Sequence, residues 1–265
     1  MRKVWPILLT AAVILACIGL DQRMIVRRYT IETNKLEMPV RLAVVTDYHG
    51  CNYGDGLIPA IADLQPDAVL MAGDMFSADW DVEAELSLFR QLASSWPTFY
   101  VTGNHEYWEH VVPALLHRVA QTGVTVLNAS HVALTVNGQT INICGIPDPY
   151  AGLNTTDALA LAAEGINRNA YTILLAHRPE AINAYAATGD FDLVIAGHAH
   201  GGQVRIPGLV NGLCAPNQGW FPKYAGGRYE VKNTTMIVSR GLSTQRQMGV
   251  PRIFNRPELV LVTIQ

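Results

Sequence analysis

The stretch RLAVVTDYHG, residues 41–50, joins an apolar run to two residues of metal-ligating type. The run Arg41–Thr46 is typical of a short buried β-strand. Asp47 and His49 follow it almost directly, and in α/β proteins ligands and catalytic groups lie at the carboxyl ends of strands. The stretch therefore predicts an α/β fold with a functional site at a strand end.

Four further motifs repeat this arrangement, each directly after an apolar run of strand length. Taken alone, one histidine at a strand end is more often structural than functional. The motifs together hold five of the eight histidines, and burying so many imidazoles and carboxylates without partners would cost on the order of several kcal/mol. Metal coordination removes that cost, so the set predicts a metal centre where five loops converge. The four motifs are Gly73-Asp74, Gly103-Asn104-His105-Glu106, His177 and Gly197-His198-Ala199-His200.

Apolar runs of strand and helix length alternate along the rest of the chain. Asn137-Gly138, between two such runs, is a strong hairpin signal. Alternating elements with extra hairpins predict an α/β fold in which two β-sheets pack face to face and are flanked by helices. We expect helices at 57–64, 82–92, 111–121 and 158–165, and strands at 41–46, 67–72, 98–102, 124–127, 132–136, 140–144, 171–176, 192–196, 203–206, 228–231, 235–239 and 258–264.

The N-terminal run Val4–Leu20 is apolar and carries no charge. Its length is at the short edge for a helix that crosses a bilayer. We favour an uncleaved membrane anchor, because no small-x-small cleavage site with a polar continuation follows the run. The alternatives are a signal peptide, a lipoprotein signal at Cys17 and a buried core helix. An anchor implies a single-pass membrane protein, and its orientation is open because basic residues flank both ends.

These features divide the chain into an anchor or signal at residues 1–22, a linker or entry strand at 23–38 and one compact domain at 39–265. Of the 265 residues, 49% are hydrophobic and 15% are charged, which excludes a disordered protein and a basic nucleic-acid-binding protein. A net charge of −3 gives no reason to expect a polyanionic partner. Four cysteines in a chain of this length do not form a disulfide scaffold.

In this order, the motifs D-x-H, G-D, G-N-H-E, H and G-H-x-H resemble the signature of the calcineurin-like metallophosphoesterases. The resemblance covers residues 41–265 and implies that family's αββα sandwich, here preceded by one transmembrane helix. The N-terminal apolar run, Gly201-Gly202-Gln203 and Arg256-Pro257-Glu258 are similar to the bacterial YkuE/YaeI-type branch of membrane-associated phosphodiesterases. Some relatives in that branch are UDP-diacylglucosamine pyrophosphatases of lipid A synthesis. Together with the anchor, the resemblance to this bacterial branch implies a protein of the bacterial inner membrane.

The resemblance also implies a dinuclear metal centre with Asp74 as the bridging ligand. Imidazole and carboxylate donors suit manganese, iron, zinc or cobalt better than calcium or magnesium, and we expect two manganese ions. With Asp47, Asp74 and a bridging hydroxide, two divalent ions leave a charge of about +1, which attracts a phosphoryl oxygen. Metal one would take Asp47, His49, Asp74 and His200, and metal two would take Asp74, Asn104, His177 and His198.

His105 is similar to the family's histidine that protonates the leaving oxygen. It directly follows a ligand, Asn104, and adjacent residues point apart, so we do not expect His105 to share that metal. Glu106 or Asp79 could orient His105. The other candidates have two interpretations each: Arg178, Arg205, Arg240 and Arg246 are phosphate contacts or structural salt bridges, and Trp80, Tyr107 and Trp108 form a wall beside the site or part of the core.

The resemblance and the anchor together favour a phosphodiesterase or pyrophosphatase that uses the bridging hydroxide on a membrane-associated or envelope substrate. The alternatives are a broad-specificity phosphomonoesterase, a UDP-diacylglucosamine pyrophosphatase, and a metal-binding scaffold without catalysis. The scaffold is disfavoured because every ligand and His105 are present. We expect no nucleic-acid partner, and the oligomeric state is left open.

Overall fold

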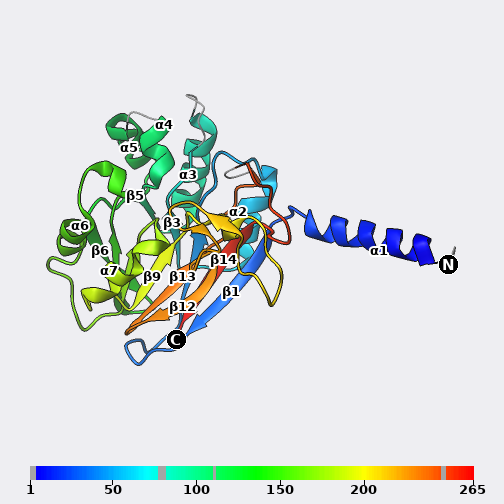
Figure 1. Cartoon of the computed structure of the whole chain (residues 1–265). Helices are drawn as coiled ribbons and strands as arrows, with labels where there is room; N and C mark the ends of the chain where they lie inside the picture. Colours follow the sequence, from blue (N-terminus) through cyan, green and yellow to red (C-terminus); the bar gives the residue numbers. More distant parts are fainter. Residues whose placement is uncertain (1–3, 77–81, 110–111, 246–248) are drawn as a thin grey trace.

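Two β-sheets packed face to face form the centre of the molecule, and helices cover the outer face of each sheet (Figure 1). The computed structural model describes residues 4–76, 82–109, 112–245 and 249–265. The arrangement confirms the predicted α/β fold with two sheets flanked by helices. The α-helices in the described part of the chain are α1 (Val4–Gly19), α2 (Leu57–Asp63), α3 (Glu83–Ser95), α4 (Asn104–Glu109), α5 (Val112–Ala120), α6 (Thr155–Ala162) and α7 (Ile182–Ala187).

The first sheet has the order β1 (Ile25–Ile31), β14 (Glu258–Ile264), β2 (Val40–Val45), β3 (Ala68–Ala72), β4 (Thr98–Val101) and β5 (Thr125–Val126). Strands β2 to β5 run parallel, so their carboxyl ends lie at one edge of the sheet. Strand β14 is antiparallel to β2, and β1 is parallel to β14. The loops that carry the first three motifs therefore leave the sheet at the same edge.

The second sheet has the order β12 (Gly227–Val231), β13 (Thr234–Val238), β9 (Leu193–Ala196), β8 (Thr172–Leu175), β7 (Gln139–Gly145) and β6 (Ser130–Val136). Strands β7, β8, β9 and β13 are parallel, and the two outer strands are antiparallel to their neighbours. Asn137 and Gly138 both have positive φ angles, 52° and 79°, as a two-residue hairpin turn of this kind requires. The predicted hairpin is confirmed.

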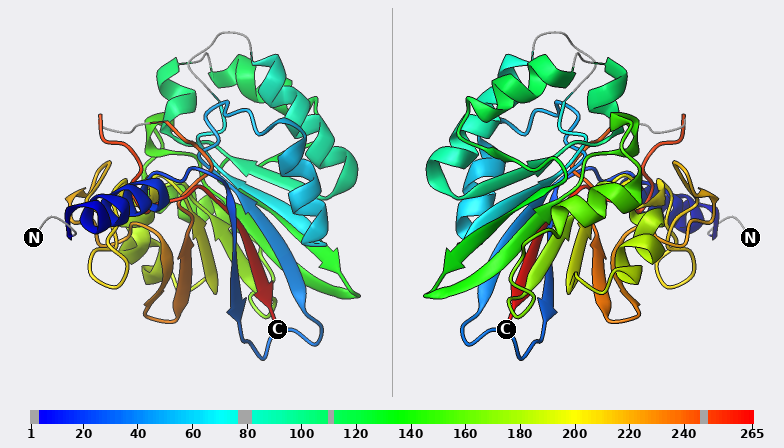
Figure 2. Two further views of the ribbon diagram at one scale, coloured as in Figure 1. Left: turned by 90° about the vertical axis from the view of Figure 1, so that its right-hand side faces the viewer. Right: turned by 90° about the vertical axis from the view of Figure 1, so that its left-hand side faces the viewer.

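Strand β2 shows why the central strands are apolar without alternation. Leu42 and Val44 point into the layer between the two sheets, whereas Ala43 and Val45 pack against the layer under α2, α3 and α5. Successive side chains of a strand point to opposite faces, and here both faces are covered. Helices α6 and α7 cover the second sheet in the same way (Figure 2).

Residues 203–206 do not form the predicted strand. Gly201, Gly202 and Gln203 have φ angles of 65°, 67° and 58°, so the chain turns back on itself just before this segment. The segment then makes only isolated bridges, Val204 to Ile253 and Ile206 to Val210. The apolar pattern of a strand is present, but the left-handed turn prevents the segment from joining either sheet.

Residues 23–38 include the edge strand β1, which pairs with β14 over its full length. Ile25–Ile31 is therefore an entry strand and not a free linker. Two short strands that were not predicted, β10 (Cys214–Ala215) and β11 (Gly219–Trp220), form a separate antiparallel pair.

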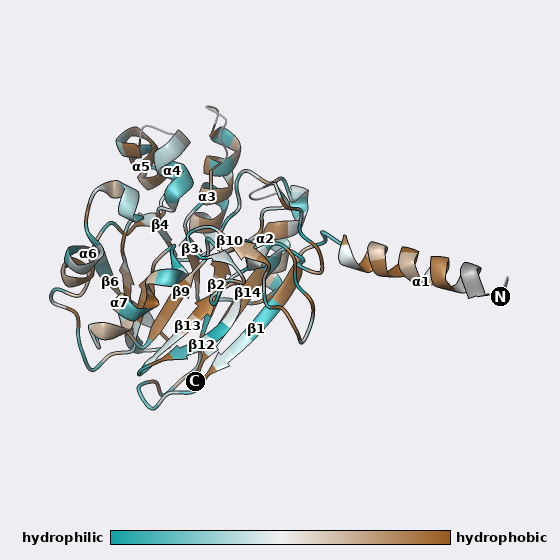
Figure 3. Ribbon diagram, viewed as in Figure 1, coloured by the Kyte–Doolittle hydropathy of each residue, from teal (hydrophilic) through white to brown (hydrophobic). Residues whose placement is uncertain are grey.

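Helix α1 leaves the body of the molecule (Figure 1), and Figure 3 shows that most of its residues are hydrophobic. Its described side chains between Leu8 and Ile18 are exposed, so the interpretation as a buried core helix is wrong. Among the described residues, no helix combines the length and the apolar character that crossing a membrane requires.

Candidate metal centre

Seven buried side chains of metal-ligating type meet at the carboxyl ends of strands from both sheets. Asp47 and His49 follow β2, Asp74 follows β3, and Asn104 is the first residue of α4 after β4. The second sheet contributes one residue after β8 and two after β9. The structure brings six of the predicted ligands together in two donor groups, namely Asp47, His49, Asp74, His177, His198 and His200. The seventh, Asn104, is buried and directly precedes His105, whose backbone N–H donates to Asp74.

Asp74 lies at the centre of this cluster. Its Oδ2 is 3.6 Å from His49 Nε2 and 3.2 Å from His177 Nε2. Donor atoms of Asp47, His49, Asp74 and His200 lie within 4.8 Å of one another, and so do those of Asp74, His177 and His198. The two groups share Asp74, as a bridging carboxylate would require.

Four buried donor atoms in the cluster have no hydrogen-bond partner in the structure. They are His49 Nε2, Asp74 Oδ2, Asn104 Oδ1 and His200 Nδ1. Buried polar atoms of folded proteins nearly always have a partner, and each exception needs an explanation. Nitrogen and oxygen donors that converge without partners fit divalent metal ions, which would satisfy them at no cost in hydrogen bonds.

Five cluster residues have a backbone conformation that side chains other than glycine rarely adopt. Asp47, His49, Asp74, His198 and His200 have φ angles of 48°, 47°, 53°, 66° and 45°. Each such residue costs on the order of 1–3 kcal/mol unless its surroundings hold it in place, and such residues concentrate at functional sites. The strained backbone turns each side chain back toward the common centre after its strand has ended.

The glycines that precede the ligands leave room for this close approach. A Cβ atom on Gly103 would lie 2.2 Å from Asp74 Oδ1. A Cβ atom on Gly197 would lie 2.2 Å from Thr46 Oγ1 and 2.4 Å from Asp47 Oδ2. The loops of different strands are thus packed so tightly that only glycine fits at these positions.

Glu106 links two of the ligand loops. It is fully buried, and its carboxylate accepts backbone N–H bonds from Gly103 (2.7 Å), Met75 (2.7 Å) and Asp74 (3.2 Å). Burial raises the pKa of Glu106, and the Asp74 carboxylate adds to this effect. The motif predicts Glu106 only as a partner of His105, and no local sequence pattern indicates this bracing role. Asp79, the other proposed partner, lies outside the described residues.

Hydrogen bonds from neighbouring groups also orient the ligands. His177 Nδ1 is 2.7 Å from the Ala72 carbonyl oxygen, so Nδ1 carries a proton, and Nε2, which faces Asp74, is the atom that would bind a metal once its own proton is displaced. Asp47 accepts bonds from the Thr46 hydroxyl (3.0 Å) and from the His198 backbone N–H (3.0 Å). The ligand atoms are thereby held in place before any ion arrives.

Burial and the Asp74 carboxylate together set the protonation of the other ligands. Burial raises the pKa of Asp47 to about 6. Burial opposes the charged form of His177, but the neighbouring Asp74 carboxylate outweighs this and raises the pKa of His177 to about 10. Burial lowers the pKa of His49 to about 4 and that of His198 to about 3. The latter two imidazoles are therefore neutral at pH 7 and have a lone pair for a metal.

His105 lies at the edge of the cluster, next to the ligands. Its ring is 4.4 Å from the His49 ring, edge to face, and its backbone N–H donates to Asp74 Oδ1 (2.9 Å). On its other side, Trp108 lies 5.0 Å away and in turn contacts Tyr150 at 5.6 Å.

Trp108 and Tyr150 are both about half exposed, so they form a wall beside His105. Of the two interpretations of Trp108, its exposure favours the wall over the core. No sequence pattern indicates that Tyr150 lies beside the site. Tyr107, the neighbour of Trp108, instead contacts the Thr102 hydroxyl (3.3 Å). Trp80 lies outside the described residues.

Arg178 is held in a buried ion pair. Its Nε and Nη2 donate to Asp148 at 2.6 and 3.1 Å, its Nη1 is 3.8 Å from Glu180, and its guanidinium lies over the Tyr150 ring. Arg178 therefore forms a structural salt bridge, which was one of its two interpretations. A contact between Arg178 and a phosphate stays a prediction.

Two other candidate arginines, Arg205 and Arg240, also bond to protein groups. Arg240 Nε donates to the buried Glu258 carboxylate at 2.6 Å. Arg205 donates to the Gly201 carbonyl oxygen and to Asn211. Arg246 lies outside the described residues.

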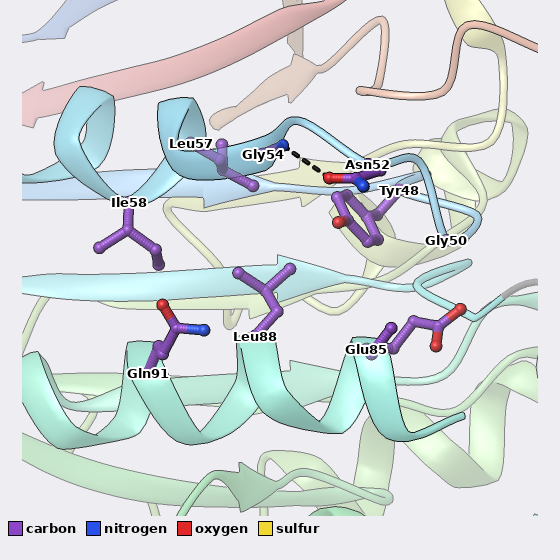
Figure 4. Close-up of a pocket in the computed structure, with 10 residues that line it drawn as sticks. Tyr48, Gly50, Asn52, Gly54, Leu57, Ile58, Glu85, Leu88 and Gln91 are labelled. Carbon is purple, nitrogen blue, oxygen red and sulfur yellow. Dashed lines mark hydrogen bonds between the residues drawn. The ribbon is translucent and has the colours of Figure 1, made fainter. Parts of the chain in front are cut away.

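A pocket of about 230 Å³ lies close to the metal-ligand loop, between α2 and α3 (Figure 4). Tyr48, Leu57, Leu88 and Gln91 are among the residues that line it. None of the seven cluster residues is part of its lining. Figure 4 shows its mixed polar and apolar side chains. Tyr48 and Gly50, which flank His49, line the pocket, so it adjoins the first ligand loop without containing a donor.

Comparison with known proteins agrees with this geometry. Residues 40–202 match the calcineurin-like phosphoesterase family. An uncharacterised metallophosphoesterase of Helicobacter pylori is 30% identical over 241 residues, which cover 88% of this chain and 61% of that protein. The uncharacterised metallophosphoesterase YkuE of Bacillus subtilis is 25% identical, with 84% and 76% of the two chains covered.

The chain thus spans about three fifths of the length of the Helicobacter relative. Among solved structures, the NAD nucleotidase of Haemophilus influenzae superposes with a TM-score of 0.56 at 15% identity, over 82% of this chain and 49% of that one. This structural similarity shows a shared fold.

Proposed function

The chain belongs to the calcineurin-like phosphoesterase family, and on that premise we propose that it is a metal-dependent hydrolase of phosphodiester or diphosphate bonds. The observation that carries the proposal is the pair of buried donor groups that share Asp74 and contain donor atoms without hydrogen-bond partners. Such an arrangement has no use in a protein that only needs to be stable, because each strained and unpaired group costs stability.

Two divalent ions are the cofactors that this proposal requires. Manganese is our first choice, with iron, zinc and cobalt as alternatives, because the donors are imidazoles and hard oxygens without any thiolate. When bound, two such ions polarise the phosphoryl oxygens and provide an activated water for in-line attack. One ion would be held by Asp47, His49, Asp74 and His200, and the other by Asp74, Asn104, His177 and His198.

The protein's own residues then have separate tasks. His105 donates a proton to the leaving oxygen as the bond from phosphorus to that oxygen breaks, which its place at the edge of the cluster supports. Glu106 keeps the loops of Asp74 and Gly103 at a constant separation. Trp108 and Tyr150 form one side of the approach to His105, where the leaving group would lie.

We assign the substrate to the membrane or its surface. Helix α1 exposes a row of large apolar side chains that no part of the described domain covers. A helix that is apolar on all sides is unfavourable in water, so we propose that the segment 1–22 attaches the catalytic domain to a membrane. A lipid-linked or envelope phosphodiester or diphosphate would then be within reach, and this location is the reason to prefer it over a soluble phosphomonoester.

A substrate panel on the purified full chain tests the proposal. Bis(p-nitrophenyl) phosphate, p-nitrophenyl phosphate and a dialkyl diphosphate would be compared before chelation, after chelation and after addition of manganese. We expect chelation to abolish hydrolysis, manganese to restore it, and the diester and diphosphate to be cleaved faster than the monoester. His117→Ala, a change at an exposed histidine of α5, is the control that should remain fully active.

Two results would overturn the proposal. Full activity in metal-stripped protein would refute the metal dependence. A clear preference for the monoester would replace the diesterase assignment with a broad-specificity phosphomonoesterase.

A further inference from the structure

Four large apolar side chains stand out from two loops that follow the last motif of the metal centre. Leu209 is 83% exposed, Trp220 and Phe221 are each 68% exposed, and Ile206 is 48% exposed. Single exposed apolar residues are ordinary, but a group of them on neighbouring loops marks a surface that contacts something apolar. We call these four residues the apolar rim.

The two loops of the apolar rim lie next to each other. Both loops are hydrogen-bonded to Gly202. Its carbonyl oxygen accepts the N–H of Val204 (2.7 Å) in the first loop and the N–H of Leu213 (2.8 Å) in the second. Phe221 is tied to the second loop by a bond from its N–H to the Leu213 carbonyl oxygen (2.7 Å).

The first loop is also rigid, because Ile206 and Val210 form a bridge that holds Leu209 at the tip. The exposure of the rim is therefore built into the fold.

The apolar rim lies beside the base of α1. Arg205 N–H donates to the Ile253 carbonyl oxygen (2.9 Å), and the next residue, Phe254, donates its N–H to the Gly19 carbonyl oxygen at the end of α1 (2.7 Å). In Figure 2 the yellow loops of this segment lie on the side of the body where α1 leaves it. The first loop of the rim and α1 thus leave the body of the molecule close to each other.

The charge of this part of the chain is one-sided. Between Asp192 and Glu230 the sequence contains no acidic residue, while it contains Arg205 and Lys223 near the rim. Arg228, the third basic residue of this interval, is paired with Glu230 at 2.7 Å. Basic residues next to exposed Trp, Phe and Leu side chains are typical of proteins that lie in the interface of a bilayer with anionic lipids. A second protein copy would not require this absence of acidic groups.

The same loops reach the metal centre. Asn217, in the turn between β10 and β11, has its Oδ1 2.8 Å from His198 Nε2, and Trp220 lies at the end of that pair of strands. His200 lies two residues before Gly202, to which both loops are hydrogen-bonded. A surface that binds the rim would therefore be close to the mouth of the metal centre.

We propose that the apolar rim inserts into the surface of an anionic lipid bilayer, as a second membrane contact besides α1, and so holds the metal centre against the headgroups. This inference rests on the proposed function, because it explains how the domain reaches a phosphate or diphosphate at the bilayer surface. It names the partner as a lipid surface with negative headgroups and the contact residues as Ile206, Leu209, Trp220 and Phe221.

Tryptophan fluorescence of the full chain tests the inference. The protein would be bound to phosphatidylcholine vesicles with and without phosphatidylglycerol, in both cases with brominated acyl chains that quench tryptophans within the bilayer. We expect a quenched component that Trp220→Phe removes, and expect it to be larger with phosphatidylglycerol. Leu209→Asp should lower that component and weaken partitioning onto the anionic vesicles by roughly tenfold.

Leu161→Asp is the control. Leu161 is an exposed leucine outside the rim, 48% exposed, on α6, and α6 lies at the far side from α1 (Figure 1). It should leave quenching and partitioning unchanged. The inference is overturned if Trp220→Phe does not change the quenching, or if Leu209→Asp and Leu161→Asp behave alike. It is also overturned if Leu209→Asp abolishes cross-linking between protein copies without changing the quenching, which would identify the rim as a protein interface.

Hydrolysis of bis(p-nitrophenyl) phosphate, measured on the same preparations with manganese, separates this inference from the proposed function. The rim variants should cleave this soluble ester at the rate of the unmodified chain, because none of the four residues belongs to the metal centre. An inactive protein whose Trp220 is quenched by lipid would refute the proposed function and keep the membrane contact. An active protein without that quenching would do the reverse.

Discussion

Replacing Gly103 by alanine should displace Asp74, the residue that the two donor groups share. The added Cβ would lie 2.2 Å from Asp74 Oδ1 and 2.6 Å from the Asp74 backbone nitrogen. Ordinary contacts begin at 3.4 Å, so the carboxylate has to retreat by about 1 Å, a misplacement that can lower a catalysed rate by about 100-fold. The backbone nitrogen cannot move aside freely, because it donates to Glu106.

The same substitution should cost the fold less than it costs the metal centre. Forcing extra volume into a well-packed interior typically costs about 1–3 kcal/mol, so the domain should remain folded with a melting temperature lowered by several degrees. Gly56→Ala is the matched control: Gly56 has a φ of −88°, and a Cβ there would meet no atom within 4 Å. We expect the control to behave like the unmodified chain.

The assay combines three measurements on the two variants. These are kcat/KM for a chromogenic phosphodiester with manganese, metal content after removal of free ions, and thermal unfolding. Gly103→Ala should lose about 100-fold in kcat/KM and bind metal more weakly, while its unfolding remains cooperative. If Gly103→Ala kept the metal content and activity of Gly56→Ala, the packing argument and the shared role of Asp74 would both be refuted.

Three further predictions concern single residues of the site. His105→Ala should cost about two to four orders of magnitude on an alkyl ester but clearly less on a nitrophenyl ester, because only an alkoxide needs a proton as it leaves; equal losses on both esters with metal retained would remove the acid role. Asp74→Asn should reduce bound metal more than Asn104→Ala does, because Asp74 lies in both donor groups; metal analysis that finds two ions per chain in the Asp74 variant would contradict this. Arg178→Ala should lower the free energy of unfolding by about 3 kcal/mol, because it leaves the buried Asp148 carboxylate without its ion pair. Arg168→Ala, at an exposed pair, should change the free energy of unfolding by less than about 1 kcal/mol, and equal denaturation midpoints for the two variants would show that the buried pair contributes nothing.

The places of the ligands could be predicted because each follows a strand whose apolar run is long enough to recognise. Asp47 after Arg41–Thr46 is the clearest case, and the structure places it at the end of β2 as expected. Parallel strands bring their carboxyl ends to one edge, so residues far apart in the chain meet there. For this part of the site, strand pattern and motif order carried enough information.

The braces around the ligands could not be predicted, because they depend on loops packed against one another. Glu106 binds the backbone of Met75 and Gly103, and nothing in the local sequence indicates that these two loops touch. Tyr150, which follows β7, reaches the site by contact with Trp108 of α4, an element from the other sheet's side of the molecule. Such contacts follow from the tertiary arrangement, not from a local pattern.

The incorrect strand at 203–206 has a different cause. Val204 and Ile206 alternate with polar residues as a strand would, and propensity alone favours that interpretation. The positive φ angles of Gly201 and Gly202 redirect the chain, and a glycine in a sequence does not reveal whether its freedom is used. The turn instead presents Leu209 at the surface.

The position of β14 between β1 and β2 has a consequence for how the chain folds during synthesis. Val26 pairs with Leu259, and Val44 pairs with Val260, so both early strands wait for a partner that the ribosome makes about two hundred residues later. Until then β2 presents an unpaired edge, and β1 has no sheet to join. Long-range pairing of this kind slows folding and exposes strand edges to aggregation.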